Sequence, residues 1–245
     1  MKILLLDIET APNLSFTWGL FNQYISIDQI VKPGYTISWA AKWLGEKEVM
    51  FDSIYNNSAK NMIKKIHKLM DEADAVIHYN GKKFDIPILN KEFLLHGLPP
   101  PSPVAQIDLL HTVRRQFKLS SNKLDFVAQS LGIGSKEKHK GFQLWVGCMN
   151  KDPDSWKVME KYNKQDVVLL EQLYHKLLPW IKGHPNLSIY HRDKVCPHCG
   201  SSHYHSKGTQ MTRGGEYRRY KCLDCNTPFR DNINIAVKDK FMEIV

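Results

Sequence analysis

Apolar runs of strand length alternate with stretches of helical spacing along the first part of the chain. The run Ile3–Leu6 stops at acidic residues and predicts a buried strand. Segments rich in β-branched and aromatic residues at 35–44 and 49–55 predict two further strands, with a spacing compatible with a hairpin. Shorter strands are predicted at 75–79 and 104–109.

Amphipathic stretches predict helices between and after these strands. Ser58 is a suitable N-cap, because apolar residues follow it at helical spacing. Strands come first as a group and then alternate with helices, which predicts an α/β fold with a mixed sheet. The predicted helices cover residues 59–72, 84–96, 109–118, 123–131 and 155–181.

Composition limits the class of protein but does not define it. The 245 residues are 42% apolar and 24% charged, as in an ordinary globular protein. Lys and Arg outnumber Asp and Glu by 34 to 25, which favours a polyanionic partner, although many basic proteins bind no nucleic acid. No apolar run approaches the ~18 residues of a membrane span, so we expect a soluble protein without a membrane partner.

Two acidic residues end the first predicted strand. Asp7 and Glu9 are two positions apart, so their side chains point to the same face of the strand. Adjacent carboxylates repel each other, and a divalent cation relieves that repulsion. The alternative interpretation is a polar strand end that leads into a turn.

Two further polar clusters are ambiguous when each is taken alone. Asn80 follows a predicted strand, and Phe84 and Asp85 open a predicted helix, where Asp85 is equally suited to be an N-cap. Tyr162 and Asp166 are four residues apart in the last predicted helix and therefore share a face.

Together the three clusters resemble the motifs of DEDD-type 3′–5′ exonucleases, the superfamily that includes polymerase proofreading domains. Asp7-Ile8-Glu9-Thr10 is similar to the first motif, Asn80–Asp85 to the second and Tyr162–Asp166 to the third. The DEDDh branch has His where this chain has Lys161, so the resemblance is to the DEDDy branch. It covers about residues 1–181 and implies an RNase H-like fold, which is a mixed five-stranded sheet flanked by helices.

The resemblance implies hydrolysis of phosphodiester bonds with two metal ions. Oxygen ligands favour Mg²⁺ or Mn²⁺, and two such ions ~3.5–4 Å apart activate water and stabilise the leaving group. Tyr162 would position the attacking water, since a phenol with a pKa near ~10 is a poor base. The implied substrate-binding residues are Thr10, Phe84 and Asn80, the last as a support of its loop. The implied metal ligands are Asp7, Glu9, Asp85 and Asp166, with Asp7 shared between the two ions.

Two Cys-x-x-Cys pairs lie near the C-terminus. Four thiolates at this spacing complete a tetrahedral structural Zn²⁺ site. The fifth cysteine, Cys148, is given no role, since a lone cysteine is usually a small buried hydrophobe. The predicted zinc ligands are Cys196, Cys199, Cys222 and Cys225.

The cysteine segment resembles the zinc ribbons attached to nucleic-acid enzymes. It predicts a second domain at 186–245, separated from the first domain at 1–182 by Gly183-His184-Pro185-Asn186. The ribbon either binds nucleic acid or docks a protein partner, and the sequence supports both interpretations equally. In the first, Tyr217 or Tyr220 stacks on bases, and the phosphates are held by Arg213, Arg218, Arg219 and Lys221.

Other polar and aromatic residues are assigned ordinary structural roles. Asp108 is expected to cap a helix, and four tryptophans are expected to serve packing. The loop 136–141 is interpreted as solvated surface, although it has the charge to face a substrate strand. The residues so assigned are Lys136, Lys138, His139 and Lys140 of this loop, and Trp39, Trp43, Trp145 and Trp156.

We therefore expect a metal-dependent 3′–5′ exonuclease that acts on single-stranded 3′ ends of nucleic acid, with DNA favoured over RNA. One alternative is a nucleic-acid-binding or adaptor protein whose nuclease core is inactive. Another is an RNase H-like endonuclease that cuts internally. A cytoplasmic location, in a bacterial cell or a phage-infected host, is the corresponding expectation.

Overall fold

The computed structural model describes residues 1–236. The chain divides into two compact units, one over Met1–Tyr174 and one from His175 onward. This division falls in the last turn of the long helix α6 (Pro153–Leu177). The boundary predicted at 183–186 stays a prediction.

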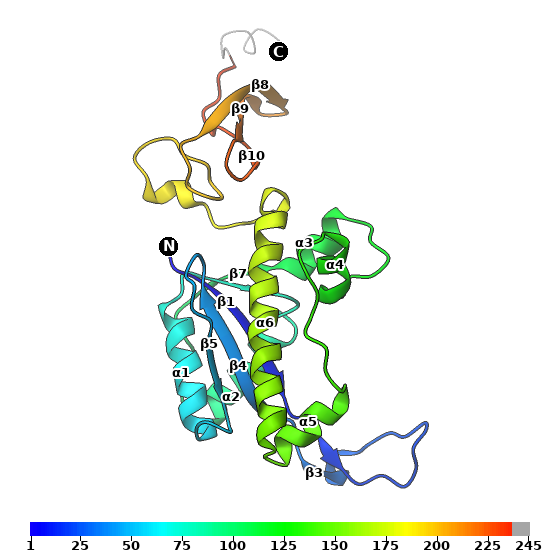
Figure 1. The fold of residues 1–245 in the computed structure, drawn as a ribbon. Coiled ribbons are helices and arrows are strands. Elements are labelled where there is room, and N and C mark those ends of the chain that lie inside the picture. Colours follow the sequence, from blue (N-terminus) through cyan, green and yellow to red (C-terminus); the bar gives the residue numbers. More distant parts are fainter. Residues whose placement is uncertain (237–245) are drawn as a thin grey trace, which may run out of the picture. The chain divides into compact units, whose positions relative to one another are not determined.

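The N-terminal unit is built on a five-stranded mixed sheet (Figure 1). The strand order is β5-β4-β1-β6-β7. β4 is antiparallel to both β1 and β5, whereas β6 runs parallel to β1, and β7 runs parallel to β6. The strands are β1 (Ile3–Thr10), β4 (Thr36–Trp43), β5 (Met50–Ser53), β6 (Ala75–His78) and β7 (Ala105–Asp108). The predicted α/β fold with a mixed sheet is therefore confirmed.

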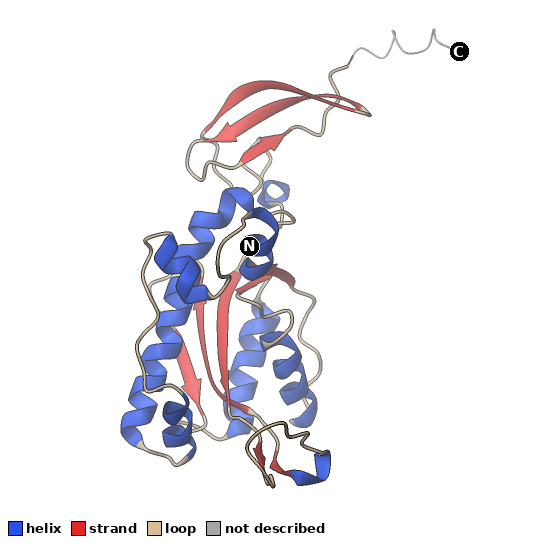
Figure 2. Ribbon diagram, turned by 90° about the vertical axis from the view of Figure 1, so that its right-hand side faces the viewer, coloured by secondary structure: helices blue, strands red, loops and turns tan. Residues whose placement is uncertain are grey.

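Helices flank this sheet on both faces (Figure 2). One face packs against α1 and α2 in an apolar core that contains Leu4, Leu6 and Ile8 of β1. The opposite face of β1 is covered by α6, whose Asn163 contacts Asp7. The helices before α6 are α1 (Ala59–Glu72), α2 (Asp85–Leu95), α3 (Leu109–Gln116), α4 (Leu124–Ser130) and α5 (Phe142–Met149).

Local sequence signals explain where several of these helices begin. Ser58 caps α1 by accepting a hydrogen bond from Asn61 N at 3.3 Å. Asp108 caps α3 through Leu110 N and His111 N, as predicted. Pro153 opens α6, where its missing N–H would have no helical partner in any case.

The acidic residues lie on the first strand, as predicted, since β1 continues beyond the apolar run to Thr10. One short helix differs from the sequence prediction. The helix α5 was not predicted, because its eight residues are mostly apolar and lack a periodic polar face. One side of α5 packs on α6 in a second apolar cluster that includes Leu144, Cys148 and Trp156.

The C-terminal unit contains a three-stranded antiparallel sheet with the order β10-β9-β8. Its strands are β8 (Tyr204–Thr212), β9 (Gly215–Cys222) and β10 (Pro228–Arg230), preceded by a short 3₁₀ helix at Leu187–Tyr190. Within residues 1–236, no helix has both the length and the apolar character that crossing a membrane requires.

Candidate active site

The alternation of side chains along β1 separates core residues from acidic residues. Leu4, Leu6 and Ile8 are buried against α1 and α2. Asp7 and Glu9, at the intervening positions, therefore point to the face covered by α6. A single strand thus contributes both to the core and to the acidic cluster.

The helix α6 holds Asp7 in place through a buried asparagine. Asn163 Nδ2 donates to Asp7 Oδ2 at 2.6 Å, and Asn163 Oδ1 accepts from Ser38 Oγ at 3.1 Å. Because Ser38 lies on β4 opposite Glu9, the amide links two strands to the helix. Asn163 has no predicted role, because nothing in its sequence position indicates that it faces the sheet.

Three carboxylates converge at this point. Asp7, Glu9 and Asp166 each place an oxygen within 4.8 Å of the other two. Burial, followed by repulsion from Asp166, raises the pKa of Asp7 well above its ordinary value and raises that of Glu9 to about 8. Such a cluster is poised to gain a cation.

The donor set fits a hard divalent metal ion. Asp166 Oδ1 is buried and has no hydrogen-bond partner among the described residues. An unpartnered buried carboxylate oxygen is costly, and a bound cation would supply its missing partner. The ligand atoms that these carboxylates offer are oxygens, which favours Mg²⁺ or Mn²⁺ over softer metals.

Asp85 stands beside this cluster rather than within it. It is the first residue of α2 and is 4% exposed, with Oδ1 accepting from Ile8 N at 3.2 Å. The N-cap position belongs to Phe84, so the capping alternative for Asp85 is wrong. Burial raises the pKa of Asp85 to about 6, and its charge in turn raises the pKa of Asp7. Its role as a metal ligand stays a prediction.

Lys136 enters the acidic cluster, contrary to its interpretation as solvated surface. Its Nζ forms an ion pair with Asp166 Oδ2 and donates to Tyr162 Oη at 3.0 Å. Burial disfavours the ammonium, but Asp166 and Tyr162 outweigh this effect and raise the pKa of Lys136. The loop is pinned where Lys136 N donates to Asp125 Oδ1 at 2.8 Å. The spacing of the lysines in this loop does not predict the contact from the sequence.

The rest of the loop divides into a half-buried and an exposed part. The ring of His139 packs against Tyr162 and Trp145 at centroid distances of 4.8 and 5.3 Å, so His139 is also a correction. Lys138 and Lys140 are exposed, as expected. Trp145 of α5 lowers the pKa of the Glu9 carboxyl, which places this tryptophan beside the site and not only in packing.

Tyr162 is a neutral phenol at ordinary pH. Burial, followed by the charge of Asp166, raises the pKa of Tyr162 above its usual value near 10. A protonated phenol cannot act as a base, but it donates a hydrogen bond. This environment suits Tyr162 to orienting a water molecule or a substrate oxygen.

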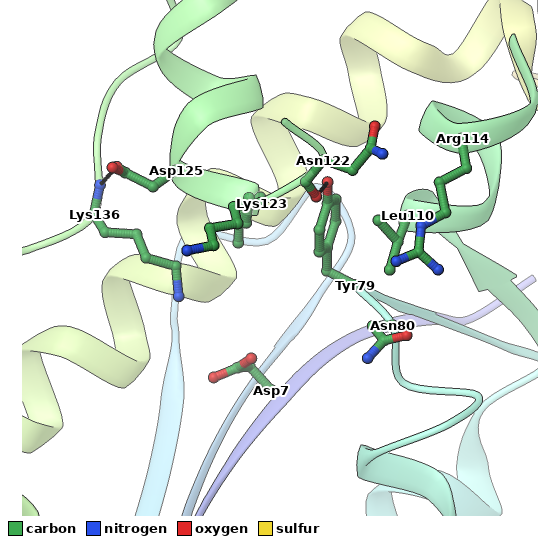
Figure 3. A pocket seen from close by; sticks show the side chains of 10 residues that line it. Asp7, Tyr79, Asn80, Leu110, Arg114, Asn122, Lys123, Asp125 and Lys136 are labelled. Carbon is green, nitrogen blue, oxygen red and sulfur yellow. Dashed lines mark hydrogen bonds between the residues drawn. The ribbon is translucent and has the colours of Figure 1, made fainter. Parts of the chain in front are cut away.

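A pocket of about 620 Å³ opens beside Asp7 (Figure 3). The ammonium groups of Lys123 and Lys136 lie on one side of Asp7, and the guanidinium of Arg114 lies on the other. Tyr79 also lines the pocket, and its hydroxyl donates a hydrogen bond to Asn122 O at 2.7 Å. The pocket therefore places a negative cluster, which attracts metal ions, next to a cationic wall, which attracts the phosphates of a nucleic acid.

The loop of the second motif shapes one wall of this pocket. Asn80 adopts a left-handed conformation (φ 70°) and is held by Asp108 Oδ1, which accepts from Asn80 N at 3.0 Å. Gly81 has no room for a side chain, because a Cβ there would lie 2.4 Å from the His78 ring. Of the other residues expected to bind substrate, Phe84 is exposed and Thr10 is half-buried at the end of β1.

The four predicted zinc ligands come together in the C-terminal unit. Their sulfur atoms lie within 4.8 Å of one another, with 3.6 Å between Cys196 and Cys225 and between Cys199 and Cys222. A tetrahedral site with Zn–S bonds of ~2.3 Å requires sulfur separations of about 3.8 Å. Gly200 has φ 74°, the left-handed conformation that the turn after the first pair needs. The cluster therefore fits a zinc ribbon.

The aromatic residues of the ribbon are mostly occupied with one another. Tyr220 is buried and packs on Tyr204 and Phe229 at 5.3 and 5.4 Å, so it is not available to stack on bases. The guanidinium of Arg230 lies 4.5 Å from the ring centre of Tyr217. Basic residues remain at the surface, and a second pocket is lined by Lys207, Arg219, Lys221 and Arg230.

Comparisons with known proteins agree with this architecture. A profile of the RNase H superfamily matches residues 4–178. The family B DNA polymerase from the hyperthermophilic archaeon Pyrobaculum calidifontis is structurally similar, with a TM-score of 0.56 and 19% identity. The similar region covers 73% of this chain but only 24% of that polymerase. The search of curated proteins gave no match.

The family match spans the sheet, all six helices and the acidic cluster, and it ends before the first zinc-ligating cysteine. The RNase H-like fold that the motifs implied is therefore confirmed. RNase H-like nucleases act with divalent metal ions, and the acidic cluster offers the oxygen ligands that such ions require. The chain belongs to the RNase H superfamily.

Proposed function

We propose that this protein is a metal-dependent 3′–5′ exonuclease of the DEDDy type that acts on DNA. The observation that carries the proposal is the convergence of Asp7 and Glu9 with Asp166, whose buried Oδ1 has no partner among the described residues. The ordered motifs and the Tyr at position 162 support the DEDDy assignment. The domain division at 1–182 and 186–245 belongs to the same proposal.

Four carboxylates would hold the metal ions, and their neighbours would keep them in position. Asn163 orients Asp7 by its 2.6 Å hydrogen bond, and Ile8 N orients Asp85. Bound Mg²⁺ or Mn²⁺ would supply an activated water and charge stabilisation at the scissile phosphate. The proposed ligands are Asp7, Glu9, Asp85 and Asp166.

Two residues beside these ligands would act on the substrate directly. Tyr162 remains protonated and donates a hydrogen bond that orients the attacking water. Lys136 holds its ammonium between Tyr162 and Asp166 and offsets negative charge where the phosphate must enter. Thr10 and Phe84 would contact the terminal nucleotide, as the family resemblance implies, and Asn80 would support the loop of the second motif.

The zinc ribbon would add affinity for the nucleic acid. Its exposed Arg213 and Arg218 and the basic pocket with Lys207, Arg219 and Lys221 support binding to phosphates. Docking of a protein partner is the competing role. A ribbon-deficient variant that loses oligonucleotide affinity, and with it the salt dependence of binding, would favour the nucleic-acid role.

The proposed activity is tested with 5′-labelled single-stranded DNA and RNA in the presence of Mg²⁺ or Mn²⁺. We expect a ladder of products shortened from the 3′ end, faster on DNA, and lost on chelation or in Asp7→Asn. Cleavage of a circular substrate would identify an endonuclease instead. Binding without turnover would identify an adaptor with an inactive core.

A further inference from the structure

An exposed aromatic arm projects from the N-terminal unit. The arm comprises residues 11–35, which connect β1 to β4 and contain the short strands β2 (Leu14–Ser15) and β3 (Ile30–Lys32). Figure 1 shows it as a blue extension beside the label β3. Four of its rings are almost fully exposed: Phe16 at 78%, Trp18 at 99%, Phe21 at 83% and Tyr24 at 94%. Aromatic side chains that are not buried against the rest of their own chain indicate an interaction surface.

The arm is rooted at the acidic cluster. It leaves the sheet directly after Thr10, which pairs with Thr36 where the chain returns, and Glu9 pairs with Ser38. Ala11 N donates to Tyr35 O at 2.8 Å and closes the base of the arm. Trp18 lies seven positions beyond Ala11 in the chain, so the first exposed rings lie within about 25 Å of the root.

The base of the arm has a defined structure. β2 and β3 pair antiparallel, and Phe16 N donates to Gln29 O at 3.0 Å while Gln29 Nε2 donates to Phe16 O at 3.0 Å. Gly34 is fixed from two sides, since its N donates to Asn13 Oδ1 and its O accepts from Lys91 Nζ. The exposed rings are therefore presented on an anchored support.

The chemistry of the arm suits bases rather than phosphates. Asp28 and Lys32 are its only charged residues, so the arm has no net charge. The cations near the acidic cluster lie instead on the pocket wall, at Arg114, Lys123 and Lys136. Aromatic rings stack on unpaired bases of any sequence, whereas bases in a duplex already stack on each other.

We propose that the arm binds the unpaired bases of a single-stranded nucleic acid by stacking, next to the end that enters the acidic cluster. This inference rests on the proposed function and assigns the expected preference for single strands to the aromatic rings of the arm. Phosphates would be held at the cationic wall and bases at the arm, so the two contributions have different dependence on salt.

The test uses the triple variant Trp18→Ala, Phe21→Ala, Tyr24→Ala. Because all three side chains are exposed, we expect its melting temperature to be unchanged. Affinity for a fluorescent single-stranded oligonucleotide, measured by anisotropy without Mg²⁺ or Mn²⁺, should weaken by at least about tenfold. The slope of affinity against salt should stay the same, since no charge is removed. An oligonucleotide of abasic residues should bind both proteins equally.

Two further variants serve as controls. Leu94→Ala removes a side chain that is 79% exposed at the far end of α2 from Asp85, and it should bind like the wild type. The conservative variant Trp18→Phe, Phe21→Tyr, Tyr24→Phe keeps the rings and should restore binding. Unchanged affinity in the triple alanine variant would overturn the inference. A dimeric wild type that becomes monomeric in the triple alanine variant would also overturn it, because the arm would then bind a second copy of the chain.

Failure of the inference and failure of the proposed function can be told apart. Cleavage of the oligonucleotide at a wild-type rate by the triple alanine variant, with unchanged binding, would reject the arm and leave the exonuclease intact. Arm-dependent binding with no cleavage under any metal would reject the exonuclease and leave the arm.

Discussion

The acidic site and the cysteine site both fit metal ions, but they are built in opposite ways. The four cysteines come from two short turns within residues 196–225, and their sulfur atoms already lie near tetrahedral separation. The three clustered carboxylates come from β1 and α6, which are distant in sequence. The first site is local, and the second exists only once the whole N-terminal unit has folded.

The two sites also differ in their effect on the stability of the folded protein. Zinc would add stability to a small unit whose apolar core consists of a few aromatic rings. The carboxylates are held together although burial and repulsion raise the pKa values of Asp7 and Glu9, and burial raises the pKa of Asp166. Such an arrangement indicates a site selected for chemistry, with Lys136 and Asn163 offsetting part of the cost.

The largest expected effect is loss of the ribbon. Cys222→Ser should abolish zinc binding and unfold the C-terminal unit, because structural zinc contributes on the order of 10 kcal/mol to such units. Unfolding of the N-terminal unit should be unchanged. Zinc content by mass spectrometry and calorimetry check both outcomes. Cys148→Ser, outside the ribbon, is the matched control and should keep its zinc; full zinc content in Cys222→Ser would show that this cysteine is no ligand.

Substitution in the acidic site should have the opposite signature. Asp166→Asn should lower nuclease activity by at least about a hundredfold, because it removes one of the converging charges, while zinc content and folding persist. Glu171→Gln, on the same helix and ion-paired with Lys42, is the control and should remain active. An active Asp166→Asn protein would remove this carboxylate from the mechanism.

A smaller effect is expected where a residue acts through its neighbour. Asn163→Ala should lower kcat by about 10- to 100-fold with little change in KM, since it frees Asp7 without removing a metal ligand. Lys164→Ala alters the adjacent residue, which pairs with Glu160, and should have no effect on kcat. A selective rise in KM in Asn163→Ala would instead assign Asn163 to substrate binding.

The pH dependence of stability gives the mildest and most specific contrast. Glu9 has a pKa of about 8 in the folded protein and about 4.5 when unfolded, so the folded state holds more protons between these values. Without Mg²⁺ or Mn²⁺, stability should therefore fall as the pH rises from about 4.5 to about 8. Thermal melts should show this slope, and it should be shallower in Glu9→Gln. Equal slopes in the wild type and in Glu9→Gln would contradict the raised pKa of this carboxyl.

The sequence predicts the candidate ligands of both sites from their spacing together with the family resemblances. Residues two apart on a strand and four apart on a helix share a face, and paired cysteines share a turn. The spacing rules paired Asp7 with Glu9 and Tyr162 with Asp166, but only the resemblance to the DEDDy motifs joined these pairs into one predicted site. The structure brings Asp7, Glu9 and Asp166 together, and it also brings the four cysteines together.

The neighbours of those ligands could not be found in the same way. Lys136 reaches the site from a loop, and Trp145 reaches it from the unpredicted helix α5. Asn163 lies on the predicted helix α6, at a position to which the sequence gives no role. Their contacts depend on packing between elements that are remote in sequence, which a periodic pattern does not encode. Tyr220 shows the reverse case, since its basic surroundings favoured base stacking but the small ribbon needs the ring for its core.

The most direct test of two separate metal sites is a Mn²⁺ titration followed by electron paramagnetic resonance. The zinc-loaded wild-type protein should bind two Mn²⁺ ions, and the double variant Asp7→Asn, Asp166→Asn should bind none tightly while its zinc content stays the same. Equal Mn²⁺ binding by the wild type and the double variant would contradict the assignment of the acidic cluster as a metal centre.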